Sequence, residues 1–543
     1  MDSKRRDLLR YSGLGLAALS APALTPSVAA AAGTASGHLA GLRAFDVTRY
    51  GATGDGKTVD SPAINRAIEA AAVVGGGMVV FPAGTYMSFS IRLKSNIHLY
   101  LGQGATLLAA DSPLPGETTG YHGGVYDPAG PAQPWEAYQD YGHNHWRNAL
   151  IWGEGLENVS ITGPGRIWGR GLSNNRGSGE WGTPFKAEQP GVGDKSIALK
   201  NCHHVLLRDF SILKGGHFGL LLTAVDNLTI DDLTIDTDRD GMDIDCCQNV
   251  RITNCTVNSP WDDGICLKSS YALGYRRDTR NVTISSCFVS GCYELGSVLD
   301  GSFRKFPEDD PIWRTGRIKC GTESNGGFIN ITITNCVFEG CYGYALESVD
   351  GAHCEDITIS NTTMRDLTCG PLFFRLGARL RGPKATTKVG TLRRVLISNL
   401  DCYAAAKSFS SVLAGIPNYP IEDVKLSNIY IEVDGEERKA IPDPSTRVSG
   451  YPDPGMFGIT PAYGFFIRNV SNLEMSHVEL ALEKQDVRPA FYLDTVERAD
   501  FFAITAPRTE GGAFSLHTVR DFRVGWSRAT PDRNLSEADS LTL

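Results

Sequence analysis

One short pattern, repeated along the chain, restricts the possible fold more than any other feature of the sequence. In each copy, β-branched or other apolar residues alternate with polar ones, and Asn, Asp, Gly or Cys flank the segment. The copies lie at residues 158–162, 227–230, 249–255, 281–285, 330–336, 356–361, 394–399, 423–428 and 472–475. Alternation with a period of two sends one set of side chains into a core and the other set outwards.

The spacing of the copies predicts how the strands are arranged. From Val205 through Leu228 to Val250 the copies are 23 and then 22 residues apart, with no helical stretch between them. A β-propeller blade would need about 40–45 residues and four strands. The shorter repeat predicts a solenoid, in which each coil buries its core against the next. We therefore expect an all-β, right-handed parallel β-helix.

The domain organisation follows from this architecture. A length of 543 residues would ordinarily suggest two or three domains, but a solenoid grows by adding coils. We predict one β-helix domain over residues 40–506 and a polar C-terminal tail at 507–543. An N-terminal cap is expected at about residues 45–86, with a helix over 61–74. Residues 112–148, rich in Gly, Pro, Tyr and Trp, predict a long loop that forms a cleft wall.

The first 30 residues predict an export signal. Residues 4–9 form a twin-arginine pattern, an apolar stretch follows at 11–24, and small residues stand at 27–29. The alternative is a short membrane anchor, but this stretch is shorter than the ~20 residues that span a bilayer. We therefore predict a twin-arginine signal peptide over 1–30, a periplasmic or secreted protein, and no membrane span.

Charge and cysteine content exclude other classes of protein. The net charge of −9 argues against binding to nucleic acid, whose phosphates need a basic surface. The chain has 13 Cys, an odd number, and Cys255, Cys287 and Cys336 occupy the same position in similar segments. This arrangement favours buried thiols within the coils over disulfides, and no Cys pair has the spacing of a zinc site.

The candidate catalytic residues are three aspartates in the most regular part of the repeat. Asp240 and Asp262 are 22 residues apart, which matches the local coil, and Asp263 follows directly. They should lie on adjacent coils, about 4.8 Å apart at the backbone. Such proximity raises the pKa of at least one carboxyl, as a general acid requires. Diverging side chains would give the ~6.5–9.5 Å opening of an inverting glycosidase. The alternative is that the acids mark turns or bind calcium.

Four cations accompany these acids. Arg317 and Lys319 are two residues apart, and therefore share one face of a strand. Lys268 and Arg239 add to the same field. Cations beside the aspartates suit an acidic poly- or oligosaccharide, whose carboxylates Arg binds through two parallel hydrogen bonds. Alternatively the cations neutralise the aspartates, and the two roles can coexist.

Together the motifs D-x-D-G, D-D-G and R-I-K, in this order on successive coils, resemble glycoside hydrolase family 28. This family contains polygalacturonases and rhamnogalacturonan hydrolases, and the resemblance covers roughly residues 45–480. It implies a pectin-lyase-like β-helix that hydrolyses O-glycosyl bonds without a metal or organic cofactor.

The resemblance also implies a role for each residue. Asp262 would protonate the glycosidic oxygen, while Asp240 and Asp263 would activate water for a single displacement with inversion. Arg317 and Lys319 would bind the sugar carboxylate just beyond the cleavage point. The implied substrate is a pectic, galacturonate-containing polymer or oligomer.

Two departures from the family pattern set this chain apart. The usual N-T-D is Asp238-Arg239-Asp240, and the G-H-G histidine has no counterpart in the matching stretch at 293–297. Long segments such as 321–327 suit closure of one end of a cleft. We therefore expect attack on the ends of homogalacturonan or rhamnogalacturonan fragments.

Three other readings remain open from the sequence. A pectate-lyase-like, calcium-dependent β-eliminase would use Asp240, Asp262 and Asp263 with Arg317 as base. A non-catalytic carbohydrate-binding β-helix would not hydrolyse any sugar, and an epimerase is a weaker possibility. The sequence gives no indication of the oligomeric state.

Overall fold

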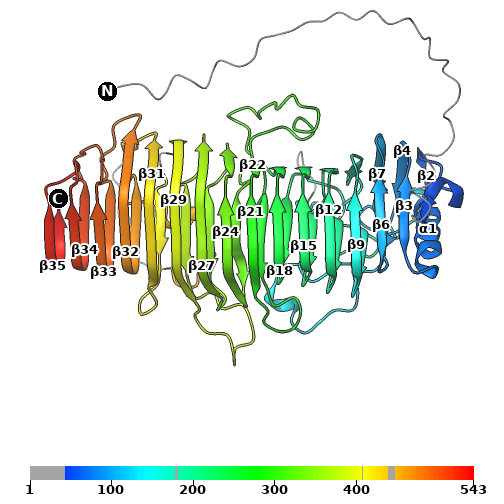
Figure 1. Cartoon of the computed structure of the whole chain (residues 1–543), viewed down its shortest axis with the longest axis horizontal. Helices are drawn as coiled ribbons and strands as arrows, with labels where there is room; N and C mark the ends of the chain where they lie inside the picture. Colours follow the sequence, from blue (N-terminus) through cyan, green and yellow to red (C-terminus); the bar gives the residue numbers. More distant parts are fainter. Residues whose placement is uncertain (1–42, 178–181, 407, 438–446) are drawn as a thin grey trace, which may run out of the picture. The chain divides into compact units, whose positions relative to one another are not determined.

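The computed structural model describes residues 43–177, 182–406, 408–437 and 447–543. This part of the chain is a parallel β-helix, as predicted, and its strands follow one another from the blue α1 end to the red C-terminal end (Figure 1). The region predicted as a signal peptide, residues 1–30, lies outside the described residues. In the described part, no helix is long and apolar enough to cross a membrane.

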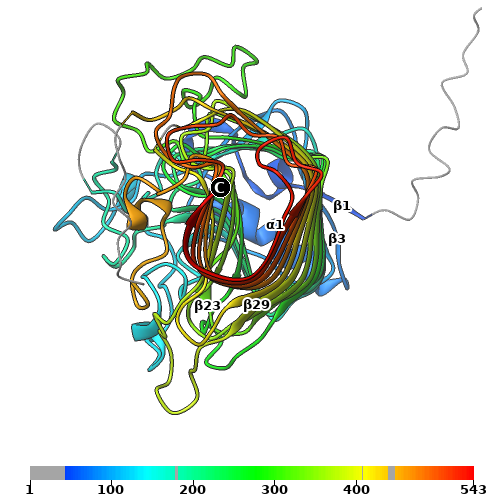
Figure 2. The same ribbon diagram turned by 90° about the vertical axis from the view of Figure 1, so that its left-hand side faces the viewer.

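Three columns of parallel strands enclose one core, which Figure 2 shows end-on. The first column consists of β5 (Ile91–Arg92), β8 (Ala149–Glu154), β11 (Lys195–Lys200), β14 (Phe218–Thr223), β17 (Asp240–Asp245), β20 (Ile265–Ser269), β23 (Ile318–Ser324), β26 (Tyr344–Ser348), β28 (Leu372–Leu376), β30 (Ser411–Ala414) and the first part of β32 (Phe465–Leu482). The second column consists of β1 (Ala44–Asp46), β3 (Gly77–Phe81), β6 (Ile97–Leu101), β9 (Glu157–Thr162), β12 (His203–Arg208), β15 (Asp226–Asp231), β18 (Gln248–Thr253), β21 (Thr279–Ser285), β24 (Gly327–Thr334), β27 (His353–Arg365), β29 (Thr391–Ala405) and β31 (Ile421–Val433). The third column consists of β2 (Asp55–Val59), β4 (Gly84–Ser88), β7 (Ala105–Ala109), β10 (Arg166–Trp168), β13 (Ser211–Leu213), β16 (Thr234–Asp236), β19 (Thr256–Asn258), β22 (Phe288–Ser290) and β25 (Val337–Glu339).

The core forms because every second side chain points inwards. On β18, Val250 and Ile252 are fully buried while Arg251 between them is exposed. Val250 stands in register with Leu228 on the preceding coil, so apolar residues stack along the axis. Full burial of such a side chain stabilises the fold by about 1.5–3 kcal/mol.

The recurrent asparagines have a structural reason. Asn227, Asn249 and Asn281 adopt left-handed backbone conformations, with φ of 53°, 59° and 58°. Asn is one of the few non-glycine residues that adopt this conformation readily. The amide of Asn249 donates to Asn227 at 3.2 Å, and that of Asn281 donates to Asn249 at 3.0 Å. The repeat thus fixes both the turn and the stacking of coils.

The cysteines behave as small core residues. All 13 are free thiols and all are buried, which confirms the prediction from their repeated positions. The register of β19 with β22 and of β22 with β25 places Cys255, Cys287 and Cys336 next to one another on successive coils.

The two ends of the β-helix are closed differently. At the N-terminal end lies α1 (Ser61–Val73), which buries Ile64 and Ile68 beneath it. At the other end the chain continues through β33 (Phe491–Phe502) and β34 (Phe514–Gly525), and β35 (Arg533–Thr542) pairs antiparallel with β34. Residues 507–543, predicted as a polar tail, instead complete the sheet. They do so because apolar residues alternate with polar ones on β34.

Two long connections flank the first column. Between β7 and β8 the chain contains only the short turns η2 (Tyr121–Gly123) and η3 (Glu136–Tyr138), as the sequence predicts for a loop. Between β22 and β23 the structure describes no helix or strand. Two further 3-10 turns are η1 (Val47–Tyr50) and η4 (Pro454–Phe457).

Candidate active site

The three candidate aspartates lie where strands β17 and β20 of the first column begin. The register pairs Met242 with Ile265, and two steps back along both strands Asp240 stands opposite Asp263. Asp262 precedes this position by one residue and belongs to the turn before β20. The pairing of Asp240 with Asp262 expected from their spacing is therefore wrong by one residue, because this coil is one residue longer than the previous one.

The aspartates nevertheless form a single cluster. One carboxylate oxygen from each of Asp240, Asp262 and Asp263 lies within 4.8 Å of the other two. This arrangement is tighter than the ~6.5–9.5 Å opening expected from the sequence. Like charges this close interact strongly, so the pKa values of Asp240 and Asp263 depend on their neighbours.

The three carboxyls differ in exposure and in proton affinity. The Asp262 side chain is 26% exposed, against 5% for Asp240 and 2% for Asp263. Burial raises the pKa of Asp240 well above its usual value, and the negative charges of Asp262 and Asp243 raise it further. Burial also opposes ionisation of Asp263, but Lys319 and Arg317 outweigh it and hold that pKa well below the usual value. The cluster thus combines a carboxyl whose pKa is raised with one whose pKa is lowered.

Arg317 and Lys319 contact Asp263 directly. Nε of Arg317 donates to one oxygen of Asp263 at 2.7 Å, and Nζ of Lys319 donates to the other at 2.8 Å. Both cations also face Glu347, at 3.5 and 3.8 Å. Both side chains are buried, so in this structure their charges are balanced by protein carboxylates.

The other two predicted cations are likewise paired. Nη2 of Arg239 donates to Asp262 at 2.7 Å, and Nζ of Lys268 donates to Glu323 at 3.0 Å. Lys268 also lies 3.7 Å from Asp243. The structure thus brings six of the seven predicted residues into direct contacts around the trio, and places Lys268 beside a second acidic group.

The stretch that the sequence aligns with the missing family histidine supplies Glu294 and Leu295 to the lining of a cavity near the site. Residues 293–297 belong to the connection after β22, where the hydroxyl of Tyr293 donates to Glu339 at 2.7 Å. Strand β23 pairs directly with β20, so Arg317 occupies the coil next to Asp263.

A histidine that sequence reasoning missed stands beside Asp240. Nε2 of His217 lies 4.0 Å from a carboxylate oxygen of Asp240, and its ring stacks on Phe218. Burial, with Arg239 as the next cause, lowers the pKa of His217 well below its usual value, so the ring is neutral. The coil period could have indicated this contact. Phe218, the residue after His217, lies one coil before Asp240 and in register with it.

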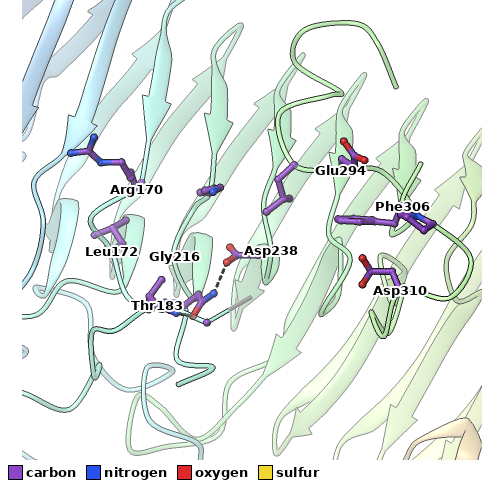
Figure 3. A pocket seen from close by; sticks show the side chains of 14 residues that line it. Arg170, Leu172, Thr183, Gly216, Asp238, Glu294, Phe306 and Asp310 are labelled. Atoms are coloured by element: carbon purple, nitrogen blue, oxygen red, sulfur yellow. Dashed lines mark hydrogen bonds between the residues drawn. The ribbon is translucent and has the colours of Figure 1, made fainter. Parts of the chain in front are cut away.

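A cavity of about 530 Å³ adjoins the cluster. Its lining includes Asn174, Thr183, Asp238 and Phe306, with Arg170 pointing away from Asp238 at one side (Figure 3). The amide of Asn174 donates to Asp238 at 2.5 Å, the contact drawn as a dashed line in Figure 3. Asp238 lies two residues before Asp240, so the cavity is near the aspartate cluster, although none of the three aspartates lines it. Its volume lies in the range of sites for small molecules.

A β-helix with clustered carboxylates beside such a cavity has the features of a glycosidase site. Residues 136–298 match the model of glycosyl hydrolases family 28, and residues 44–128 match that of "Rhamnogalacturonase A/epimerase, pectate lyase-like". The match to family 28 covers less than half of the chain but contains all three aspartates, and the chain is a glycosidase.

Individual relatives agree with this assignment. A probable polygalacturonase of Vitis vinifera is 24% identical over 448 residues, covering 76% of this chain and 78% of the relative. The family 28 exopolygalacturonase of Yersinia enterocolitica has the same fold, with a TM-score of 0.61, 18% identity, and coverage of 86% and 79%. The Thermotoga maritima exopolygalacturonase gives a TM-score of 0.53 and 19% identity, covering 72% of this chain and 87% of that one.

Proposed function

We propose that this protein is an inverting, exo-acting hydrolase of pectic, galacturonate-containing poly- or oligosaccharides. The observation that carries the proposal is the cluster of Asp240, Asp262 and Asp263, in which one oxygen of each carboxyl lies within 4.8 Å of the others and the pKa of Asp240 is raised. General acid–base hydrolysis of a glycosidic bond needs one carboxyl that donates a proton and another that accepts one.

The proton moves within this cluster during one turnover. Burial and the negative charge of Asp262 raise the pKa of Asp240, so Asp240 holds a proton that it can pass to Asp262. With the proton on Asp262, the most exposed of the three, it passes to the glycosidic oxygen as the bond to the anomeric carbon breaks. Water then bonds to that carbon and releases its proton to ionised Asp240. Transfer from Asp240 to Asp262 restores the starting state.

Asp263 has a different task. Its two ion pairs keep it ionised throughout, so it orients the attacking water and stabilises positive charge developing on the sugar. Arg317 and Lys319 act through Asp263 in this scheme, and the role as direct ligands of a sugar carboxylate remains part of the proposal.

Inversion is tested by the configuration of the product. The tight carboxylate cluster resembles the ~5–5.5 Å spacing common in retaining enzymes, whereas the family resemblance and the base role of Asp240 favour a single displacement. Proton NMR of the first product of trigalacturonate hydrolysis should therefore show the inverted anomer. Retention at early times would overturn the mechanism.

Exo-action and substrate class are tested by product size. The long connections 110–148 and 291–317, which flank the site, support attack at chain ends. Homogalacturonan and rhamnogalacturonan oligosaccharides should release short products progressively, while polymeric pectin keeps its viscosity. Rapid loss of viscosity would exclude exo-action, and an ultraviolet-absorbing unsaturated product that a chelator abolishes would indicate β-elimination. Absence of hydrolysis on the whole panel would favour a carbohydrate-binding role.

We also propose export by the twin-arginine route. The pattern at residues 4–9 supports this step. Replacing Arg5 and Arg6 by Lys should retain the protein inside the cell, and unchanged export of that variant would rule the route out.

A further inference from the structure

A buried carboxylate outside the aspartate trio, that of Asp236, lies at the end of β16 in the third column. Its side chain is fully buried, and Asn258 at the end of β19 stands in register with it on the next coil. The amide of Asn258 donates to one oxygen of Asp236 at 2.9 Å. A carboxylate is costly to bury unless hydrogen bonds replace its contacts with water, so the other partners of Asp236 indicate its role.

Those partners belong to the connection 291–317, which leads from β22 to β23. The backbone N–H groups of Gly296 and Val298 both donate to the second oxygen of Asp236, at 2.7 and 3.3 Å. Asn258 adds two bonds to the same connection, because its amide donates to the carbonyl of Tyr293 at 2.9 Å and accepts from the N–H of Tyr293 at 3.3 Å. The first residues of the connection are thus fixed to side chains of two adjacent coils.

The chemistry of these contacts suits an aspartate and no other side chain of the same shape. The N–H groups of Asn258, Gly296 and Val298 all point at the carboxyl, and an ionised carboxylate only accepts hydrogen bonds. Burial raises the pKa of Asp236 to about 6, although the three donors oppose this shift. Above that pH the ionised group accepts all three bonds, whereas an asparagine would turn an amide N–H towards a donor.

The connection forms one wall of the cavity of about 530 Å³. Its contributions to the lining are Glu294, Leu295, Phe306, Pro307 and Asp310. Figure 3 shows Glu294, Phe306 and Asp310 on one side of the cavity, with Arg170, Leu172 and Thr183 on the other. Glu294 and Leu295 directly precede Gly296, so the hydrogen bond that holds Gly296 also places these two lining residues.

The same connection is attached a second time, next to the trio. Phe306 and Ile312 pack on Trp261, the residue directly before Asp262. This second attachment is apolar and lies farther along the connection. Loss of the polar anchor at Asp236 should therefore free the start of the connection while Asp262 keeps its neighbours.

We propose that Asp236 is a positioning residue, which holds the start of the connection 291–317 as a wall of the cavity and so limits the length of saccharide that the cavity admits. Because Asp236 is fully buried, it acts through Glu294 and Leu295, the lining residues beside its backbone partners. The effect on saccharide length rests on the proposed function, whereas the anchoring of the connection does not.

Hydrogen exchange of the full-length protein, followed by mass spectrometry, tests the anchor directly. At neutral pH, Asp236→Asn should speed exchange in residues 293–298 about 10–100-fold, the effect of losing hydrogen bonds to a charged group. Asp231→Asn is the matched control, because Asp231 accepts from the amide of Asn254 on the next coil at 3.0 Å but lies on the second column. It should leave exchange in residues 293–298 unchanged. An unchanged rate in Asp236→Asn overturns the proposal.

The wild type alone decides the anchor should Asp236→Asn unfold, which circular dichroism would reveal. Residues 293–298 of the wild type should exchange more slowly than residues 307–313 of the same connection. Equal rates in the two segments overturn the proposal.

Kinetics with saccharides of different length test the consequence. Asp236→Asn should raise KM for trigalacturonate more than it lowers kcat, and should raise kcat/KM for hexagalacturonate relative to trigalacturonate. A general loss of stability would reduce the amount of active protein and leave KM and this ratio unchanged. Faster exchange with an unchanged ratio overturns the role in saccharide length. Wild-type protein that hydrolyses neither saccharide overturns the proposed function, while the exchange result still decides the anchor.

Discussion

The outer faces of the first and second strand columns carry opposite chemistry on the same coils. On the second column, Asn227 and Asn249 stand at the surface and are joined by amide hydrogen bonds. On the first, Asp240 and Asp263 are buried. The connection before β8 covers part of this column, where Trp146 packs with Ala198 and Leu221. The coils thus set the register of the strands, and the connecting segments determine which face of the β-helix is shielded from water.

This difference in burial changes how much a charged side chain contributes to stability and how far its pKa shifts. An exposed ion pair is screened and contributes about 0–1 kcal/mol. A buried charge without its partner is costly, and its pKa shifts strongly. The first column therefore concentrates interacting charges, whereas the second stabilises the stack through neutral, repetitive contacts. Substitutions at equivalent places on the two columns should have unequal effects.

The largest difference is expected in turnover. Asp262→Asn removes the proposed acid and should lower kcat about 10²–10⁴-fold on galacturonate oligosaccharides. Asp231→Asn, at the end of strand β15 in the second column, should leave kcat unchanged. Equal losses in both variants would show that the two faces do not differ in function. Steady-state kinetics with trigalacturonate provides the measurement.

The next difference is expected in stability. Lys319→Met leaves Asp263 buried with one cation fewer, and should lower the free energy of unfolding by about 3–5 kcal/mol at pH 7. Lys425→Met breaks an exposed pair with Glu474 on β31, and should cost less than about 1 kcal/mol.

The pH dependence of Lys319→Met has a defined sign. Because the folded pKa of Asp263 is depressed, its stabilisation is present above its unfolded pKa of about 3.9 and disappears as pH falls through the folded value. Denaturant titrations should therefore show a smaller gap between wild type and Lys319→Met at low pH. A gap that grows on acidification would contradict the ion-pair assignment.

A third difference concerns the alkaline limb of activity. Arg239 lowers the raised pKa of Asp240, so Arg239→Gln should move the fall of kcat/KM to higher pH. Arg251→Gln on exposed β18 should not move it. The raised folded pKa of Asp240 also means that its contribution to stability declines as pH rises through that value. A shift to lower pH in Arg239→Gln would remove Asp240 from the acid–base scheme.

The smallest effect is expected on the second column itself. Asn249→Ala places a residue with a Cβ but no amide at φ 59°, and should cost about 1 kcal/mol. Asn249→Gly should cost less, because glycine adopts this φ without strain. Thermal unfolding of the two variants would rank them, and the reverse order would show that the amide ladder, not the backbone conformation, dominates.

Much of the fold could be predicted because the patterns that specify it lie within short stretches of the sequence. The alternation around Val250 and the spacing from Leu228 predict stacked strands, and the repeated Cys positions predict buried thiols; the structure confirms both. The prediction of a polar tail after residue 506 is wrong, because β34 continues the parallel strands by pairing with β33 and only β35 pairs antiparallel. A single coil one residue longer than its neighbour was enough to misplace Asp262 relative to Asp240.

The sequence by itself determined the class of fold and which aspartates meet, because a period-two pattern and a coil length are properties of the chain alone. Only the tertiary structure decided how those acids differ. The ion pairs of Asp263 with Arg317 and Lys319, and the position of His217 beside Asp240, join residues from different coils. Proton affinity depends on burial and on neighbouring charges in space, so it emerges only when the coils are stacked and the long connections cover them.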